Sequence, residues 1–512
     1  MQTAIQRLSL LLFGAFTFVL PAAQINAAEP FIARIPRVWD DDAMAKLEIR
    51  LATDVKVQHI PSAYYYQIPV RTIYKTYAIY HPDREPPGYF AALLQKDPEI
   101  AFDSSRLKTK EDWIRAGQKV FESGLTPLST DVPFTQVRNR AWYTETDAPL
   151  TKDGIMPLYR YVIRKRGQVE VTMDSCATCH TRVLPDGTAI QGAQGSVAFG
   201  KLFAFHIRHS PDAYRYKPAR PQLLDLFGTP WIQPDPQAAL MNMQMNDIAD
   251  IVDRLPHGVV PRDGTSLAYS VQIPDLLGVH DRKYLDHTGL QHNGGLADLM
   301  RYDAINNFIN DLTAFGDFRP FNALKSVAPA DALPPASSQS RYSDEQLYAL
   351  ALFLESLRAP ENPNKANALS RYGERVFAAQ KCGICHTPPL FTNNKLTPVS
   401  GYDWQLRNRD LQQDIIPISV GTDSTNALLT RRGTGFYKVP SLRGVWYRGP
   451  LEHNGSIASL EEWFNPARLR SDYGSNNAKP YGMETNAVAG HQFGLDLSVR
   501  DKAALIAYLR TL

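Results

Sequence analysis

The apolar positions of two distant segments repeat with the period of an α-helix. In "SDEQLYALALFLESL", which begins at Ser343, and "SVRDKAALIAYLRTL", which begins at Ser498, large apolar residues recur every three or four positions. Each segment opens with a serine, and a polar residue, Gln346 or Asp501, follows three positions later. This pairing is typical of a capped helix start. We therefore predict two capped amphipathic helices that correspond to one another.

A second pair of helical patterns lies further upstream in each half. "RAGQKVFESG" (115–124) resembles "RYGERVFAAQ" (371–380), although two unrelated amphipathic helices would fit this pair about as well. The later helix leads directly into a cysteine motif. Before the earlier motif the chain inserts a longer stretch that includes "LYRYVIRKRGQVEVTM" (158–173), whose composition predicts strands.

The clearest repeat joins "IPDLLGVHDRKYLDHTG" (273–289) to "VPSLRGVWYRGPLEHNG" (439–455). Without a gap, the two stretches agree at eight of 17 positions, and both keep a histidine. The matching pairs are Pro274/Pro440, Leu276/Leu442, Gly278/Gly444, Val279/Val445, Arg282/Arg448, Leu285/Leu451, His287/His453 and Gly289/Gly455. We predict the same turn in two copies of one structural unit.

The N-terminus has the layout of a secretory signal peptide. Arg7 is followed by an apolar run from Leu8, and small residues suited to cleavage after Ala27 or Ala28 come next. A membrane anchor is the alternative, but the run is short for a span and ends at Pro21. We expect residues 1–28 to be removed and the mature protein, without a membrane span, to be periplasmic or secreted.

Composition narrows the function classes only slightly. The 512 residues include 44% hydrophobic and 21% charged residues, which is ordinary for a globular protein of several domains. The net charge of +3 gives no argument for nucleic acid as a partner. Residues 29–110, which contain the β-type stretch "PSAYYYQIPVRTIYKTYAIYHP", lie outside the repeat, and the sequence assigns them no role.

The cysteines carry the strongest chemical signal. All four lie in "DSCATCHTR" and "KCGICHTPP", each of which is a C-x-x-C-H motif. This motif attaches a c-type haem through two thioethers, and the adjacent histidine becomes the proximal iron ligand. The motifs therefore predict two covalent haems, on Cys176, Cys179 and His180 and on Cys382, Cys385 and His386.

Other uses of paired cysteines explain the pattern less well. Two disulfides would suit an exported protein, and a C-x-x-C pair can be a redox dithiol or half of a zinc site. None of these requires a histidine at the same offset twice.

The whole arrangement resembles the bacterial dihaem cytochrome c peroxidase superfamily, which includes MauG-type enzymes and the rubber-oxygenase type. The resemblance rests on "RVFAAQKCGICHTPP", "VPSLRGVWYRGPLEHNG" and "GHQFGLDLSVRDKAALIAYLRTL", and more weakly on the first copy. The wide spacing of the haem motifs is closest in layout to the rubber-oxygenase type.

The resemblance implies a mainly α fold with two cytochrome-c-like helical haem domains in tandem and β-containing insertions in the N-terminal half. The expected order is a signal peptide (1–28), an N-terminal extension (29–110), an N-terminal haem domain (111–360, motif at 176–180), a linker (361–369) and a C-terminal haem domain (370–512, motif at 382–386).

For the C-terminal haem, the resemblance implies six-coordinate iron. His491, in the loop before the last helix, is the favoured second ligand. Two alternatives remain: Met483 is the second ligand, or His491 is a surface histidine that does not bind iron. His453 is expected to pack beside the haem without ligating iron.

The N-terminal haem departs from the peroxidase pattern. The family's removable distal histidine has no counterpart before Pro274, which leaves His206, His209 and His257 as alternatives that do not fit the family spacing. The family's catalytic glutamate is also missing, because no glutamate occurs between Glu170 and Glu345. A carboxylate for acid–base catalysis would then be Asp298 or Asp303.

His287 stands where the resemblance implies an electron-relaying tryptophan. A histidine can bridge haem propionates, or it can simply order the turn. Downstream phenylalanines and Met300 favour either core packing or an apolar pocket over an open haem; they are Phe308, Phe315, Phe318 and Phe321. Three alternating methionines, Met241, Met243 and Met245, can fill a pocket or ligate a metal.

We therefore expect a dihaem oxidoreductase, peroxidase- or oxygenase-like, whose open N-terminal haem activates hydrogen peroxide or dioxygen. The C-terminal haem would transfer electrons. An apolar organic substrate and a small redox protein as electron donor are the further expected partners. The alternative is a pure electron carrier with two six-coordinate haems.

Overall fold

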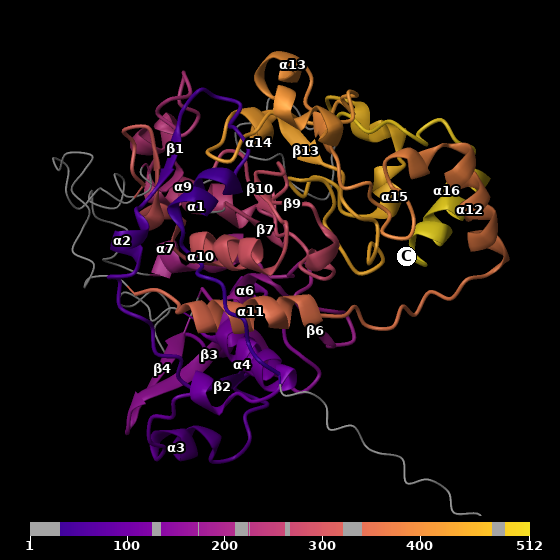
Figure 1. Cartoon of the computed structure of the whole chain (residues 1–512). Coiled ribbons are helices and arrows are strands. Elements are labelled where there is room, and N and C mark those ends of the chain that lie inside the picture. Colours follow the sequence, from indigo (N-terminus) through magenta and orange to yellow (C-terminus); the bar gives the residue numbers. More distant parts are fainter. Residues whose placement is uncertain are drawn as a thin grey trace, which may run out of the picture.

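The computed structural model describes residues 31–124, 135–172, 174–209, 224, 226–261, 267–320, 340–473 and 487–512, without the side chains of 307–311. The predicted signal peptide lies outside these residues. Figure 1 shows the N-terminal half on the left and below, and the last helices on the right, joined by an extended connection. None of the helices in the described ranges has the length and apolarity that a bilayer crossing requires.

The described chain is rich in helices. Their bounds are α1 Asp41–Leu47, α2 Ser62–Tyr65, α3 Tyr89–Leu94, α4 Lys110–Glu122, α5 Arg140–Thr146, α6 Cys176–Cys179, α7 Phe199–His209, α9 Met245–Asp253, α10 Leu296–Leu312, α11 Asp344–Ser356, α12 Ala368–Ala379, α13 Trp404–Arg407, α14 Thr425–Leu428, α15 Leu460–Trp463 and α16 Val499–Leu509.

The strands form small antiparallel sheets. Their bounds are β1 Val57–His59, β2 Thr76–Tyr80, β3 Ile155–Lys165, β4 Gln168–Thr172, β5 Thr181–Val183, β6 Ala189–Gln191, β7 Val259–Val260, β8 Val271–Gln272, β9 Tyr284–Leu285, β10 Gln291–His292, β11 Thr313–Phe315, β12 Leu396–Pro398 and β13 Phe436–Lys438. The three-stranded sheet, β2-β3-β4, lies in the N-terminal half and contains the predicted strands 158–173. A mainly helical chain with β insertions is thus confirmed, whereas the two haem domains and their boundaries stay predictions.

Two helix pairs repeat the same packing. Helix α4 lies along α11, and α12 lies along α16 (Figure 1). A Cβ added to Gly117 of α4 would lie 1.9 Å from the carbonyl oxygen of Ala349, and one added to Gly373 of α12 would lie 1.9 Å from that of Ala504. Glycine therefore allows the two backbones to touch at the same point in both pairs.

The predicted caps of the second helix in each pair are also present. Ser343 accepts a hydrogen bond from the N–H of Gln346, and Ser498 accepts one from the N–H of Asp501. These bonds fix where α11 and α16 begin, because they satisfy N–H groups that have no partner inside the helix.

The repeated histidine turns have the same backbone. Asp286 and Glu452, which precede the two histidines, both adopt left-handed conformations, with φ of 69° and 68°. Gly289 and Gly455 follow with φ of 66° and 73°, and each donates its N–H back to that acidic residue. The sequence repeat is therefore also a structural repeat.

Each histidine turn accepts a main-chain hydrogen bond from a strand of the other half. Gln272 of β8 donates its main-chain N–H to the oxygen of His453 at 2.8 Å, and Lys438 of β13 donates to the oxygen of His287 at 3.0 Å. Gln272 and Lys438 occupy matching positions, one residue before the repeated stretches. The bonds are thus reciprocal across the boundary between the halves.

The N-terminal extension packs onto the N-terminal half. The fully buried Trp39 stacks on Tyr65 with ring centres 4.4 Å apart and donates to the oxygen of Ile60 at 2.9 Å. Strand β1 pairs with β11, and the N–H of Val38 donates to Asp344 at the start of α11. These contacts give residues 31–110 a structural role that the sequence did not reveal.

Candidate functional site

The first C-x-x-C-H motif is held by a short capped helix. Helix α6 (Cys176–Cys179) begins at Ser175, whose hydroxyl caps it, and the N–H of His180 donates to the oxygen of Cys176 at 2.8 Å. The Nδ1 atom of His180 lies 3.0 Å from the carbonyl oxygen of Pro274. A carbonyl can only accept, so Nδ1 carries the proton and Nε2 carries the lone pair that a metal uses.

The second motif repeats this arrangement. The N–H of His386 donates to the oxygen of Cys382 at 2.9 Å, and its Nδ1 lies 3.1 Å from the oxygen of Pro440 and 3.2 Å from that of Phe391. Pro440 is the repeat partner of Pro274. Both predicted proximal histidines are therefore fixed in the same tautomer by the same residue of the repeat, which is how ligating histidines are usually oriented.

The four cysteines are unbridged thiols in this structure. A structural zinc site needs four ligands. The described residues contain no group of three or more His, Cys, Asp or Glu side chains placed to hold a metal ion.

His491 lies opposite His386. Their ring centres are 6.3 Å apart, with the ring planes at 55°. Two imidazoles on opposite sides of one metal ion, each bonded at about 2.0 Å with a ring centre about 1.1 Å beyond its nitrogen, would be about 6.2 Å apart. Burial lowers the pKa of both rings, so both are neutral and able to ligate. The pair fits a six-coordinate haem iron.

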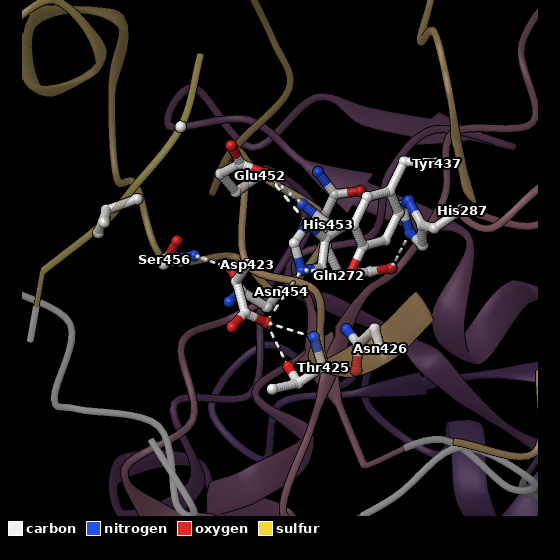
Figure 2. Close-up of polar contacts among 12 residues, drawn as sticks. Gln272, His287, Asp423, Thr425, Asn426, Tyr437, Glu452, His453, Asn454 and Ser456 are labelled. Carbon is white, nitrogen blue, oxygen red and sulfur yellow. Dashed lines mark hydrogen bonds and ion pairs between the residues drawn. The ribbon is translucent and has the colours of Figure 1, made fainter. Parts of the chain in front are cut away.

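The two turn histidines have different partners, Glu452 and Asp423 at His453 and the main chain of Gln272 at His287 (Figure 2). Burial lowers the pKa of His453, but hydrogen bonds and charges from Asp423 and Glu452 outweigh it and raise the pKa to about 9. Glu452 lies 3.1 Å from Nδ1 and Asp423 3.7 Å from Nε2. Tyr437 stacks on the ring at 4.2 Å and shares a 3.0 Å hydrogen bond with Nε2.

His287 is neutral by contrast. Burial and the charge of Lys438 lower its pKa to about 4, although Asp286 acts in the opposite direction. Its Nε2 donates to the main-chain oxygen of Gln272 at 2.7 Å. His287 therefore joins the strand that supports His180 and orders the turn by a hydrogen bond to the backbone.

A buried basic cluster lies where the halves meet. Burial lowers the pKa of Lys438 to about 7, and the charges of Arg282 and Arg448 lower it further, against the effect of Asp286. Arg282 donates to the oxygen of Leu277, and Arg448 donates to that of Ser441. Within the described part of the chain, Nε of Arg448 is buried without a hydrogen-bond partner. Carboxylates would satisfy this cluster, and each haem carries two of them as propionates.

The two candidate acids differ sharply. Burial raises the pKa of Asp303 well above its usual range, and its charge is among those that affect Cys176 of the first motif. Asp298 instead accepts from Gly294 and pairs with Arg301 at 2.8 Å in the first turn of α10. Burial thus favours the protonated form of Asp303, which lies near the first motif, whereas Asp298 stabilises a helix start.

Two of the three upstream histidines are engaged elsewhere. His209 stacks on Phe205 with ring centres 3.9 Å apart, and its Nδ1 lies 2.9 Å from the oxygen of the same residue. His257 lies 3.6 Å from a carboxylate oxygen of Asp147. His206 is buried on α7, and burial lowers its pKa.

Only some residues of the predicted apolar pocket lie within the described ranges of the structure. Trp231 contacts Phe315 and Phe318 with ring centres 5.2 and 5.6 Å apart, and Met300 is fully buried in the core. Phe321, the side chain of Phe308 and Met483 lie outside the described residues. Of the three methionines, Met243 and Met245 pack against the cluster around α9.

Several important residues carried no signal in the sequence. Asp423 and Tyr437 belong to no local motif, and both contact His453, which lies 16 residues or more away along the chain. Glu452 could have been noticed, because it directly precedes the repeated histidine as Asp286 does in the first copy.

Comparison with known proteins gives a distant relationship. No family model matches the chain. The methylamine utilization protein MauG of Paracoccus denitrificans (strain Pd 1222) is 26% identical over 173 residues, which cover 30% of this chain and 45% of MauG. The chain therefore matches less than half the length of this relative.

Two solved structures are similar at a lower level. One is a MauG-like protein associated with microbial copper homeostasis, with 19% identity, coverage of 49% of this chain and 73% of that chain, and a TM-score of 0.28. The other is hydrazine synthase of Kuenenia stuttgartiensis, with 14% identity, coverage of 61% and 92%, and a TM-score of 0.27. Scores this low do not establish a common overall fold.

The closer likeness in layout to the rubber-oxygenase type stays a prediction. The match to MauG agrees, at a distant level, with the resemblance of the repeated motifs to the MauG/cytochrome c peroxidase-like superfamily.

Proposed function

We propose that the chain is a dihaem c-type cytochrome oxidoreductase. One haem is attached at Cys176 and Cys179 with His180 below the iron, and the other at Cys382 and Cys385 with His386. The observation that carries the proposal is the separation of 6.3 Å between the rings of His386 and His491. The matching bonds of His180 and His386 to Pro274 and Pro440 support it.

The two sites have different tasks in this proposal. His386 and His491 would together hold the C-terminal haem, which would then serve electron transfer. The N-terminal haem, held by His180, would supply the reaction with hydrogen peroxide or dioxygen. When bound, this haem supplies the redox chemistry, and the polypeptide supplies orientation and protons.

Asp303 is the proposed proton donor of the N-terminal site. Burial raises the pKa of its carboxyl and so favours the protonated form, and the carboxyl lies close enough to Cys176 to influence the pKa of that thiol. A neutral acid of this kind can give a proton to a leaving oxygen and recover it from water. This feature favours an enzyme over the alternative, an electron carrier with two six-coordinate haems, which needs no acid.

The other expected partners belong to the same proposal. The oxidant is hydrogen peroxide or dioxygen, and the reductant is a small redox protein or an apolar organic substrate. The apolar run before Pro21 supports export to the periplasm or the medium by a cleaved signal peptide.

Visible and electron paramagnetic resonance spectra of the purified protein test the proposal. We expect one low-spin haem that does not bind carbon monoxide or cyanide, and one haem that binds both. His491→Ala should convert the low-spin haem to high spin, while His280→Ala, which changes an exposed histidine paired with Asp281 at 3.3 Å, should not. Two low-spin haems that bind no added ligand would establish the electron carrier instead.

A further inference from the structure

A buried arginine lies beside the loop that carries His491. Arg468, at the end of the 3-10 turn Pro466–Leu469, is fully buried. Its Nε donates to the oxygen of Trp463 at 2.9 Å. Its two terminal nitrogens donate to the oxygens of Val488, Gly490 and His491, the last two at 2.9 and 3.0 Å.

Among the described residues, the hydrogen bonds of the buried Arg468 guanidinium all go to main-chain oxygens. A buried charge is costly unless it is paired, and Arg468 is satisfied by four main-chain carbonyls, three of them in the segment 488–491. Burial lowers its pKa, with Glu452 acting in the opposite direction. Only the planar guanidinium can donate in several fixed directions at once, so lysine could not replace it.

The loop that Arg468 holds is strained. His491 has a φ of 41°, which residues with a side chain rarely adopt. The N–H of His491 donates to the oxygen of Val420 at 2.7 Å, on the opposite side from Arg468. A strained residue persists only where its surroundings fix it, and such residues gather at functional sites.

The ring of His491 is also confined. Trp463 contacts it with ring centres 5.0 Å apart, and the guanidinium of Arg468 lies 5.8 Å from the ring centre of Trp463. A Cβ added to Gly490 would lie 2.1 Å from the main-chain nitrogen of Thr422, so the loop touches a neighbouring backbone. Arg468 thus fixes both the backbone of His491 and the aromatic ring beside its side chain.

We propose that Arg468 is a positioning residue that holds His491 at the distance from His386 where one haem iron fits between the two rings. This inference rests on the proposed function. Without the guanidinium, the backbone at 490–491 loses its support on one side and can relax to an unstrained conformation. His491 then leaves the axial position, and the C-terminal haem becomes open to small ligands.

The test compares Arg468→Met with Arg431→Met in the full-length haem-loaded protein. Arg431 is a matched control, because it is fully buried and donates to the oxygen of Gly228 in another part of the molecule. We expect Arg468→Met to lose most of the low-spin signal and to raise carbon monoxide binding from about one to about two per chain. Added imidazole should restore the low-spin signal, and Arg431→Met should keep it.

A second variant tests the same inference if Arg468→Met fails to fold. Gly490→Ala displaces the same loop without removing a buried charge, and we expect the same loss of low-spin signal. The inference is overturned if His491→Ala converts the haem to high spin while neither Arg468→Met nor Gly490→Ala changes the spectrum. If His491→Ala itself has no effect, the proposed ligation is wrong.

Discussion

The main-chain N–H of Gln272 donates to the main-chain oxygen of His453 across the boundary between the two halves of the chain, at 2.8 Å. This bond and its counterpart from Lys438 to His287 mean that each histidine turn is supported by a strand of the other half. Two residues after Gln272 the chain reaches Pro274, which orients His180. The support of each turn and the orientation of each proximal histidine are therefore linked.

Cleavage in the connection between the halves should leave them associated. Residues 363–369 are exposed, so a specific protease site introduced there should be cut without disturbing the core. We expect the two fragments to elute together in size-exclusion chromatography and to separate only in denaturant. Fragments that separate in native buffer would contradict the mutual support of the turns.

The charge of His453 should make stability fall at alkaline pH. Its pKa is about 9 in the folded protein and about 6.5 when unfolded, so its contribution is complete below about pH 6.5 and is lost as pH rises through about 9. Relative to His453→Gln, the wild-type free energy of unfolding should fall by about 2 to 3 kcal/mol over that interval. Denaturant unfolding across the pH range measures this difference, and parallel curves for the two proteins would refute it.

His287 should act in the acidic range instead. Burial and the charge of Lys438 lower the pKa of His287 in the folded protein to about 4. Between about pH 6.5 and 4, His287 is therefore protonated in the unfolded chain but not in the folded one. Stability should therefore fall as pH drops through this interval. His287→Gln should flatten the pH dependence of the melting temperature there, and an unchanged dependence in the variant would show that His287 titrates normally.

The close helix contacts should tolerate no methyl group. Gly117→Ala and Gly373→Ala each place a Cβ 1.9 Å from a carbonyl oxygen, so the paired helices must separate. Overpacking of this kind costs about 1 to 3 kcal/mol. Gly383→Ala is the control, because the nearest atom would be 3.9 Å away and the first motif has Ala177 there. Equal melting temperatures for all three variants would be the contrary result.

Replacing the buried acid should slow the reaction with peroxide. Asp303→Asn removes the transferable proton and should lower the rate about 100-fold, a typical effect of losing a general acid. Asp298→Asn, on the same helix but paired with Arg301, should react at the wild-type rate. Stopped-flow spectra after mixing with hydrogen peroxide measure both rates, and equal rates would remove Asp303 from the proposed mechanism.

The sequence predicts those features that depend on neighbours along the chain. The capped helices at Ser343 and Ser498 are examples, because periodicity and cap lie within one short segment. The sequence did not reveal Arg468, whose partners Gly490 and His491 lie more than 20 residues away. Such contacts depend on how the chain folds back on itself, and no local pattern records them.

The sequence also did not reveal the difference in pKa between His287 and His453, because this difference too depends on residues that are distant along the chain. Their turns match in sequence and backbone, so the repeat itself carries no sign of different charge states. The difference comes from Asp423 at one ring and Lys438 near the other, which only the folded structure brings close.

The reciprocal bonds between the histidine turns have the form of contacts in a two-fold symmetric dimer, where position i of one subunit meets position j of the other and j meets i. The chain thus makes one contact twice, in both directions, as a pair of identical subunits would. Two units within one chain do not need identical sequences, unlike the subunits of a homodimer. A homodimer must place the same charge in both turns, whereas this chain keeps His453 protonated and His287 neutral across one shared interface.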